Sequence, residues 1–223
     1  MSDTITWPTA HPLFSRAEAA RSRPLYEAGK RSLDVLLSAA ALAVALPTMV
    51  ALGLAVQLTS PGPTLFRQRR LGLGGREFWC YKFRTMVADA EDQLRSRRAF
   101  QDQFGANFKI KSDPRVTRLG AFLRKSSLDE LPQLWNVLRG DLSLIGPRPI
   151  VPHEREKYGW HAETLLSVKP GLGGIWQVYG RSDTNDEERI GMDVRYVETR
   201  SAWVDLKLIF LTAYVVARGR GPG

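Results

Sequence analysis

The strongest pattern in the sequence is a long uncharged stretch near the N-terminus. Between Val35 and Phe66 no residue carries a charge, and Val35–Leu58 is almost wholly apolar. A helix needs roughly 20 apolar residues to cross the hydrocarbon core of a bilayer, and a soluble domain of this size seldom contains such a run. The pattern therefore predicts a membrane helix over about residues 33–59.

Two features of this segment bear on how the helix enters the membrane. Pro47 lies in its middle, where a proline removes a backbone hydrogen bond and bends the helix. Cations flank both ends, and the positive-inside rule keeps such ends on the cytoplasmic side; they are Arg21, Arg23, Lys30 and Arg31 before the segment and Arg67, Arg69 and Arg70 after it. By residue pattern alone, a re-entrant helix bent at Pro47 and a plain transmembrane helix are equally open.

A second pattern lies between residues 128 and 138, where apolar residues recur at helical spacing. It predicts one amphipathic helix. Ser127 followed by Glu130 has the form of a capping box; alternatively, Asp129 is the cap and places Pro132 in the first turn, where a missing N–H has no cost. Either start puts both acids in or beside the first turn, whose positive end favours ionised carboxylates.

Alternating segments predict a β-hairpin directly after the membrane helix. Thr64–Arg69 and Glu77–Phe83 alternate as strands do, and the glycine-rich residues between them are typical of a hairpin turn. Alternation places Lys82 and Arg84 on the same face of the second strand. Two cations on one strand face are usually a solvated edge, but they can also bind a diphosphate.

The rest of the chain is predicted to be mostly helical. Helical or mixed segments are expected at Val87–Phe104, Ile150–Glu163, Asp183–Arg200 and Ala202–Val216, and a short extended piece at Ile175–Val178. The last helix would dock on the core or lie in the membrane interface. The glycines at 171, 173 and 174 allow backbone to approach a ligand closely, though tight turns explain them nearly as well.

These elements predict an α+β, mostly helical protein with a small β-hairpin. Residues 1–29 would be a flexible basic tail, residues 30–217 one membrane-anchored domain, and residues 218–223 a second flexible tail.

The composition limits which kinds of molecule the protein is expected to bind. The 223 residues carry a net charge of +9, which indicates anionic partners such as nucleic acid, lipid head groups or phosphorylated substrates. A single cysteine, Cys80, excludes an intrachain disulfide and fits a reducing compartment. The three histidines do not cluster with it, so no zinc site is expected.

Candidate chemistry gathers between Arg115 and Pro149. This segment sets cations around the adjacent acids Asp129 and Glu130; the cations are Arg115, Arg118, Arg124, Lys125, Arg139 and Arg148. In one interpretation the acids are helix caps and the arginines their surface partners. In the other the segment is a phosphate site, because the cations outnumber the acids and lie beside a helix N-terminus. Adjacent helical carboxylates point about 100° apart, so they would divide labour, one as nucleophile and one as ligand of a cation.

Three motifs in register resemble the bacterial sugar transferases, the monotopic polyprenol-phosphate phosphoglycosyl transferases. They are KFRTM at Lys82–Met86, SDPRVTRLGAFLRKSSLDELPQLWNVLRGDLSLIGPRP at Ser112–Pro149 and KPGLGGIWQVYGR at Lys169–Arg181. The resemblance covers nearly everything from Lys30 to about Val216. It implies that the break at Pro47 makes the membrane helix re-entrant, with the catalytic domain at the cytoplasmic face of the bacterial inner membrane.

The resemblance also implies the reaction and the residues that perform it. Asp129 would attack the β-phosphate of a UDP-sugar, release UMP and form a phosphosugar–enzyme, from which polyprenol phosphate would take the phosphosugar. Glu130 would bind Mg²⁺. Phosphates would be held by Lys82, Arg84, Arg115, Arg118, Arg124 and Arg148, and the nucleotide would be bordered by Pro147 and Pro149. The lack of an N-terminal multi-span region resembles the short members of exopolysaccharide pathways, which favours a hexose such as glucose or galactose.

Two other classes compete with a transferase. A basic chain with six tryptophans has the composition of a nucleic-acid-binding module, but such a module has no use for Val35–Leu58, so no nucleic acid partner is expected. A non-enzymatic membrane scaffold would tolerate Asp129→Asn, whereas the transferase would not.

Overall fold

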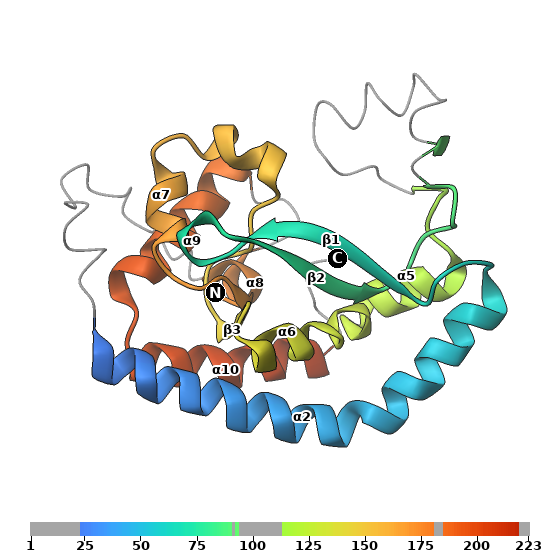
Figure 1. The fold of residues 1–223 in the computed structure, drawn as a ribbon, viewed down its shortest axis with the longest axis horizontal. Helices are drawn as coiled ribbons and strands as arrows, with labels where there is room; N and C mark the ends of the chain where they lie inside the picture. Colours follow the sequence, from blue (N-terminus) through green and yellow to red (C-terminus); the bar gives the residue numbers. More distant parts are fainter. Residues whose placement is uncertain (1–22, 91, 94–112, 181–184, 219–223) are drawn as a thin grey trace, which may run out of the picture.

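A computed structural model describes residues 23–90, 92–93, 113–180 and 185–218; the predictions for 1–22, for most of Val87–Phe104 and for 219–223 lie outside them. The described residues are mostly helical and contain two small sheets (Figure 1), in agreement with the predicted α+β class. In chain order the elements are α2 (Pro24–Thr59), β1 (Leu65–Leu71), η1 (Leu73–Gly75), β2 (Glu77–Phe83), α5 (Arg118–Lys125), η2 (Leu128–Glu130), α6 (Gln133–Arg139), β3 (Ser143–Ile145), η3 (Pro152–Tyr158), α7 (His161–Leu166), β4 (Gly171–Gly173), α8 (Ile175–Tyr179), α9 (Asp186–Thr199) and α10 (Ala202–Ala217).

The apolar helix α2 begins earlier than predicted. It runs from Pro24, so residues 24–29 are helical and do not belong to a tail. Proline suits the first helical position because its missing N–H would have no partner there. Pro47 lies inside the helix, and Figure 1 shows that α2 bends in its second half, as an internal proline causes. We call the parts before and after Pro47 the first and second arms of α2.

Buried polar side chains fix the first arm to the rest of the protein. Arg31 donates hydrogen bonds to two carbonyls at the C-terminal end of α6 (2.6 and 2.7 Å). Asp34, which is buried, accepts from the hydroxyl of Ser143 (3.1 Å) and from the next backbone N–H of β3 (2.9 Å). Lys30 forms an ion pair with Asp205 of α10 (3.0 Å). Because a buried charge is costly unless it is paired, these contacts hold the first arm in one register.

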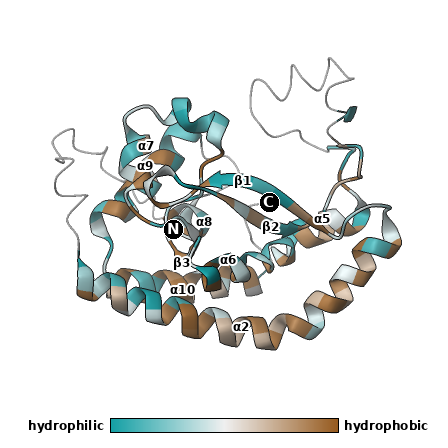
Figure 2. Ribbon diagram, in the orientation of Figure 1, coloured by the Kyte–Doolittle hydropathy of each residue, from teal (hydrophilic) through white to brown (hydrophobic). Residues whose placement is uncertain are grey.

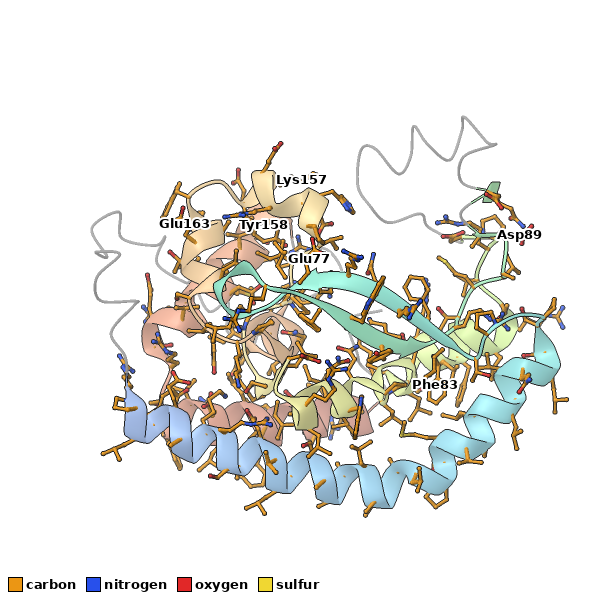
Figure 3. All side chains as sticks on the ribbon, in the orientation of Figure 1. Glu77, Phe83, Asp89, Lys157, Tyr158 and Glu163 are labelled. Atoms are coloured by element: carbon orange, nitrogen blue, oxygen red, sulfur yellow. The ribbon has the colours of Figure 1, made fainter. Side chains whose placement is uncertain are left out.

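The second arm packs against the segment that carries the two adjacent acids. A small core forms where α2, β2 and α5 meet; it consists of Val56, Phe83 and Leu123, with Met49, Leu52, Leu119, Leu128 and Leu131 packed around it. Phe83, labelled in Figure 3, ends β2 beside this arm. Since Leu128 and Leu131 flank Asp129 and Glu130 in the chain, α2 directly supports the turn on which these acids lie.

One side of the molecule is markedly apolar. Figure 2 shows hydrophobic residues along α2 and α10, whose N-terminal parts are linked by the ion pair of Lys30 and Asp205. α2 is long and apolar enough to span a membrane, and no other helix among the described residues is: its 18-residue window has a mean hydropathy of 2.3, and 6% of that window is buried. On α10 the large apolar side chains Trp203, Phe210 and Tyr214 are exposed.

The predicted hairpin is confirmed. β1 and β2 pair antiparallel, with Gln68 opposite Cys80 and Arg70 opposite Phe78. Because side chains alternate along a strand and opposite residues share a face, Arg70, Cys80 and Lys82 lie on the same face of the hairpin.

A second, parallel pair of strands was not predicted. β3 pairs with β4, which contains two of the glycines that were explained by close approach to a ligand or by tight turns. The backbones approach so closely beside this pair that a Cβ on Gly171 would lie 2.0 Å from the backbone nitrogen of Gly146. These glycines therefore allow backbone to pack on backbone. The extended piece predicted at Ile175–Val178 is wrong, since these residues belong to helix α8; so short an apolar run fits either period.

The helical predictions after β3, apart from residues 183–184, which lie outside the described residues, are confirmed. Ile150–Glu163 contains η3 and the start of α7, and the last two segments form α9 and α10. Together with β3 and α8 these elements enclose the larger core, which includes Ile145, Leu165, Val197 and Leu208.

Candidate active site

A pocket lies between the hairpin, the η2 turn and the loop that follows β3. It holds both predicted acids together with cations from separate segments of the chain. Its lining residues are Arg70, Cys80, Lys82, Arg124, Ser127, Asp129, Glu130, Gln133, Arg148, Pro149, Gly171, Leu172 and Gln177. Four of them are cations and two are carboxylates, so the pocket carries an excess of positive charge that suits a polyanionic ligand.

The turn that carries the acids differs from the predicted helix. Leu128–Glu130 is a single 3₁₀ turn, and α6 starts only at Gln133, with Pro132 as its N-cap. Ser127 makes no capping bond; it has a φ of 56° and its N–H donates to the carbonyl of Arg124 (3.2 Å), so it closes α5. The predicted capping box and continuous helix are therefore wrong. A non-glycine residue in this conformation is strained by about 1 kcal/mol or more, and such strain clusters at active sites.

Asp129 is a buried carboxyl facing cations. It is 8% exposed. Burial raises the pKa of Asp129 to about 6; Glu130 acts in the same direction, whereas Lys82 and Arg124 act against it. A helix end would favour the ionised form, as predicted from the sequence, but desolvation dominates. At pH 7 the group is still mostly ionised, at about 90%, and it is a stronger base than an ordinary aspartate.

Glu130 is the more accessible acid and has a direct partner. Its side chain is 34% exposed and forms an ion pair with Lys82 of β2. Burial alone would raise the pKa of Glu130, but the Lys82 ammonium outweighs it and the pKa is lowered. The two adjacent acids thus have pKa values displaced in opposite directions, a common property of catalytic pairs.

Arg124 and Arg148 line the pocket from separate segments of the chain, α5 and the residues after β3. Arg124 donates from Nε to the hydroxyl of Thr85 (2.9 Å), which orients its guanidinium. The Arg148 guanidinium lies 5.2 Å from the ring centre of Trp176, within the range of a cation–π contact. These contacts of the two guanidinium groups in the pocket are with neutral partners, a hydroxyl and an indole ring.

The structure does not bring three predicted phosphate ligands to the pocket. Arg84 is buried and donates to the backbone carbonyls of Ser60 and Pro61 at the end of α2. Arg115 is buried against Asp113 (2.6 Å). Arg118 is exposed on α5 and is not among the lining residues.

The two proline predictions differ in outcome. Pro149 lines the pocket, whereas Pro147 is fully buried and is not among the lining residues. Three polar lining residues were missed: Arg70, Gln133 and Gln177. Hairpin alternation could have found Arg70, because its register places it on the face of Lys82.

We expect Arg84→Lys to destabilise the protein by about 2 kcal/mol, since a buried guanidinium that satisfies two carbonyls would be lost. The melting temperature (Tm) in detergent should fall by roughly 4–8 °C. The KM for the UDP-sugar, measured at low temperature, should be unchanged. Arg69→Lys, an exposed replacement on β1, is the control and should leave Tm in place. A raised KM with an unchanged Tm would restore Arg84 as a phosphate ligand.

Comparison with known proteins identifies the family of this chain. The model of a family described as bacterial sugar transferase matches residues 25–219. The exopolysaccharide production protein ExoY of Rhizobium meliloti is 39% identical over 222 residues, which cover 98% of both chains. The undecaprenyl-phosphate galactose phosphotransferase of Salmonella typhimurium is 43% identical over 196 residues, which cover 86% of this chain and 41% of that one.

A third relative is the UDP-glucose:undecaprenyl-phosphate glucose-1-phosphate transferase of Escherichia coli, 35% identical over 228 residues, which cover 95% of this chain and 47% of that one. The chain thus spans less than half the length of the galactose and glucose transferases, and nearly all of ExoY. Since the family model matches most of the chain and ExoY aligns from end to end, the chain belongs to the bacterial sugar transferase family.

Proposed function

We propose that this protein transfers a hexose 1-phosphate from a UDP-sugar to polyprenol phosphate, of the undecaprenyl type, and releases UMP. The observation that carries the proposal is the pocket, in which a buried carboxylate faces four cations on a domain fixed to an apolar helix. Relatives named for the transfer of galactose and glucose 1-phosphate to undecaprenyl phosphate support the substrate class. The reaction would initiate an exopolysaccharide or a related glycan.

In the proposed mechanism Asp129 is the nucleophile. A carboxylate oxygen forms a bond to the β-phosphorus of the UDP-sugar, the bond from that phosphorus to the bridging oxygen breaks, and UMP leaves. The phosphosugar remains on Asp129 as an acyl phosphate. A phosphate oxygen of polyprenol phosphate then attacks the same phosphorus and frees the carboxylate, giving polyprenol-diphosphate-sugar. Lys82, Arg124, Arg148 and Arg70 lower the barrier because they offset phosphate charge in a partly water-excluded pocket.

The pocket fits Mg²⁺ when a diphosphate is present. Among the described residues no three His, Cys, Asp or Glu side chains gather into a metal cluster. Mg²⁺ is usually held by one or two carboxylates together with substrate phosphates and water, and Glu130 is the accessible carboxylate. When bound, the ion would supply further charge screening. Lys82 holds Glu130 in place beside Asp129.

The same structure favours a re-entrant α2. Arg31 and Asp34 fix the first arm to α6 and β3, and Arg84 fixes the residues that follow the second arm. A helix that crossed the bilayer would separate its ends by the membrane, whereas here both ends are attached to one domain. We propose that α2 bends at Pro47 within the membrane and that the domain lies on the cytoplasmic face.

Cysteine labelling tests this topology. In a Cys80→Ser background, single cysteines at Ser32 and Thr64 should both resist an impermeant thiol reagent added outside intact cells, and both should react after lysis. Pro47→Leu should straighten α2 and shift some molecules to a spanning form, with labelling of one site only. Labelling of one site and not the other in the parent would mean that the helix spans the membrane.

The substrate class is tested by UMP release from a panel of UDP-sugars, with and without polyprenol phosphate. We expect release from UDP-glucose or UDP-galactose and sustained turnover only with the lipid. Sustained turnover with water as the acceptor would instead indicate a hydrolase.

A further inference from the structure

Asp193 is a deeply buried acid of α9 to which the sequence gives no function. It is 1% exposed, and its Oδ1 atom lacks a hydrogen-bond partner in the described structure. Few buried polar groups are left unpaired in native proteins, because each costs free energy. An unpaired oxygen in the core costs less free energy on a neutral carboxyl than on a carboxylate, so the surroundings of Asp193 disfavour its ionised form.

The groups around Asp193 connect it to the pocket. Its charged neighbours are Arg148 and Arg189, whose guanidinium groups lie 5.2 and 5.9 Å from the ring centre of Trp176. Tyr158 of η3, labelled in Figure 3, accepts a hydrogen bond from Arg189 (3.2 Å). The titratable groups on the other elements packed against α9 are His161 and Glu163 of α7 and Tyr179 of α8. Of the charged neighbours, Arg148 also lines the pocket.

Near neutral pH the protonated and ionised forms of Asp193 are present in comparable amounts. Burial raises the pKa of Asp193 to about 7, although the backbone N–H and guanidinium of Arg148, and the guanidinium of Arg189, act in the opposite direction. An ionised Asp193 offsets part of the charge that Arg148 presents to the pocket. A protonated Asp193 leaves that charge in full, and a bound diphosphate would in turn favour the protonated form.

We propose that Asp193 is a positioning residue for Arg148, which presents its full charge to the donor diphosphate when the Asp193 carboxyl takes up a proton from solvent. This inference rests on the proposed function, since it takes the ligand to be a UDP-sugar. In this arrangement α9 contributes to donor binding. The affinity for the donor depends on pH through the Asp193 carboxyl, which does not touch the substrate.

Donor binding to the full-length Asp129→Asn variant tests the coupling, because this variant removes both the titration of Asp129 and the first chemical step. With UDP-glucose and UDP-galactose as probes, calorimetry should give a Kd that rises about tenfold between pH 6 and pH 8.5. Adding Asp193→Asn, which mimics the protonated carboxyl, should abolish this rise and keep the affinity near its pH 6 value. Adding Glu187→Gln, an exposed replacement on the same helix, should leave the rise intact.

Four results would overturn the inference. A pH dependence unchanged by Asp193→Asn, or an affinity lowered equally at every pH, would make Asp193 a purely structural residue. If the double variant does not fold, the proton uptake that accompanies donor binding to the Asp129→Asn variant is measured instead. At pH 7 an uptake of about 0.3 to 0.8 protons per bound donor is expected. An uptake of zero would refute the coupling. Absence of donor binding by every variant and by the wild type would instead refute the proposed function, and the inference with it.

Discussion

An Asp129→Asn variant is expected to lose at least about 10³-fold of its activity and, at the same time, to become more stable. Activity falls because an amide is a poor nucleophile. Stability rises because the ionised carboxylate is held in a desolvated place: its folded pKa of about 6 lies above the unfolded value near 4. Such a group stabilises the fold when protonated, and that contribution is lost as pH rises through 6. The amide avoids the loss, a gain of about 2–3 kcal/mol at pH 7.

Thermal unfolding followed by tryptophan fluorescence, in one detergent, measures this effect. The melting temperature of Asp129→Asn should exceed that of the wild type by roughly 4–12 °C at pH 7.5, and the difference should nearly vanish by pH 4. Asp89→Asn, a replacement at an exposed position, should match the wild type at both pH values. A variant that melts below the wild type at pH 7.5 would mean that Lys82 and Arg124 stabilise the carboxylate more than burial disfavours it.

The second large effect is expected at the arginines that line the pocket from two separate segments of the chain. Arg124→Lys and Arg148→Lys keep the charge but lose the planar fork that grips two phosphate oxygens. A charged hydrogen bond contributes about 1.5–3 kcal/mol, so kcat/KM should fall about 10- to 100-fold with little change in Tm. Arg118→Lys is the matched control, because Arg118 lies outside the pocket lining.

Steady-state kinetics with saturating lipid acceptor distinguishes these outcomes. If neither Arg124→Lys nor Arg148→Lys changed kcat/KM, these arginines would not bind the diphosphate. Lys82 and Arg70 would then be the phosphate ligands. If Arg118→Lys lost as much activity as they did, a second phosphate contact outside the described pocket would be required.

The elements that sequence alone predicted are those with a strong local period. The alternation of Glu77–Phe83 places Lys82 correctly, and the uncharged run ending at Phe66 marks the helix that proline bends. Asp129 and Glu130 stand out because they are adjacent acids among cations, and both line the pocket.

The errors occurred where tertiary contacts override local pattern. The spacing of residues 128–138 fits one helix, but the strained Ser127 and the N-cap Pro132 divide it, and this keeps Leu128 and Leu131 packed beside the second arm of α2. Arg84 shares a motif with Lys82, yet two free carbonyls after α2 bind it. Asp193 has no local signal, because its surroundings come from segments far apart in the chain.

The most direct test of the account is a single-turnover measurement with UDP-sugar and no lipid acceptor. A nucleophilic Asp129 splits the transfer into two half-reactions, so about one equivalent of UMP should be released per site. Intact-protein mass spectrometry should then find one added sugar phosphate, which disappears when polyprenol phosphate is supplied. Asp129→Asn should show neither the burst nor the adduct. Release of UMP only after polyprenol phosphate is added, with no adduct at any time, would contradict the account and leave Asp129 without a covalent function.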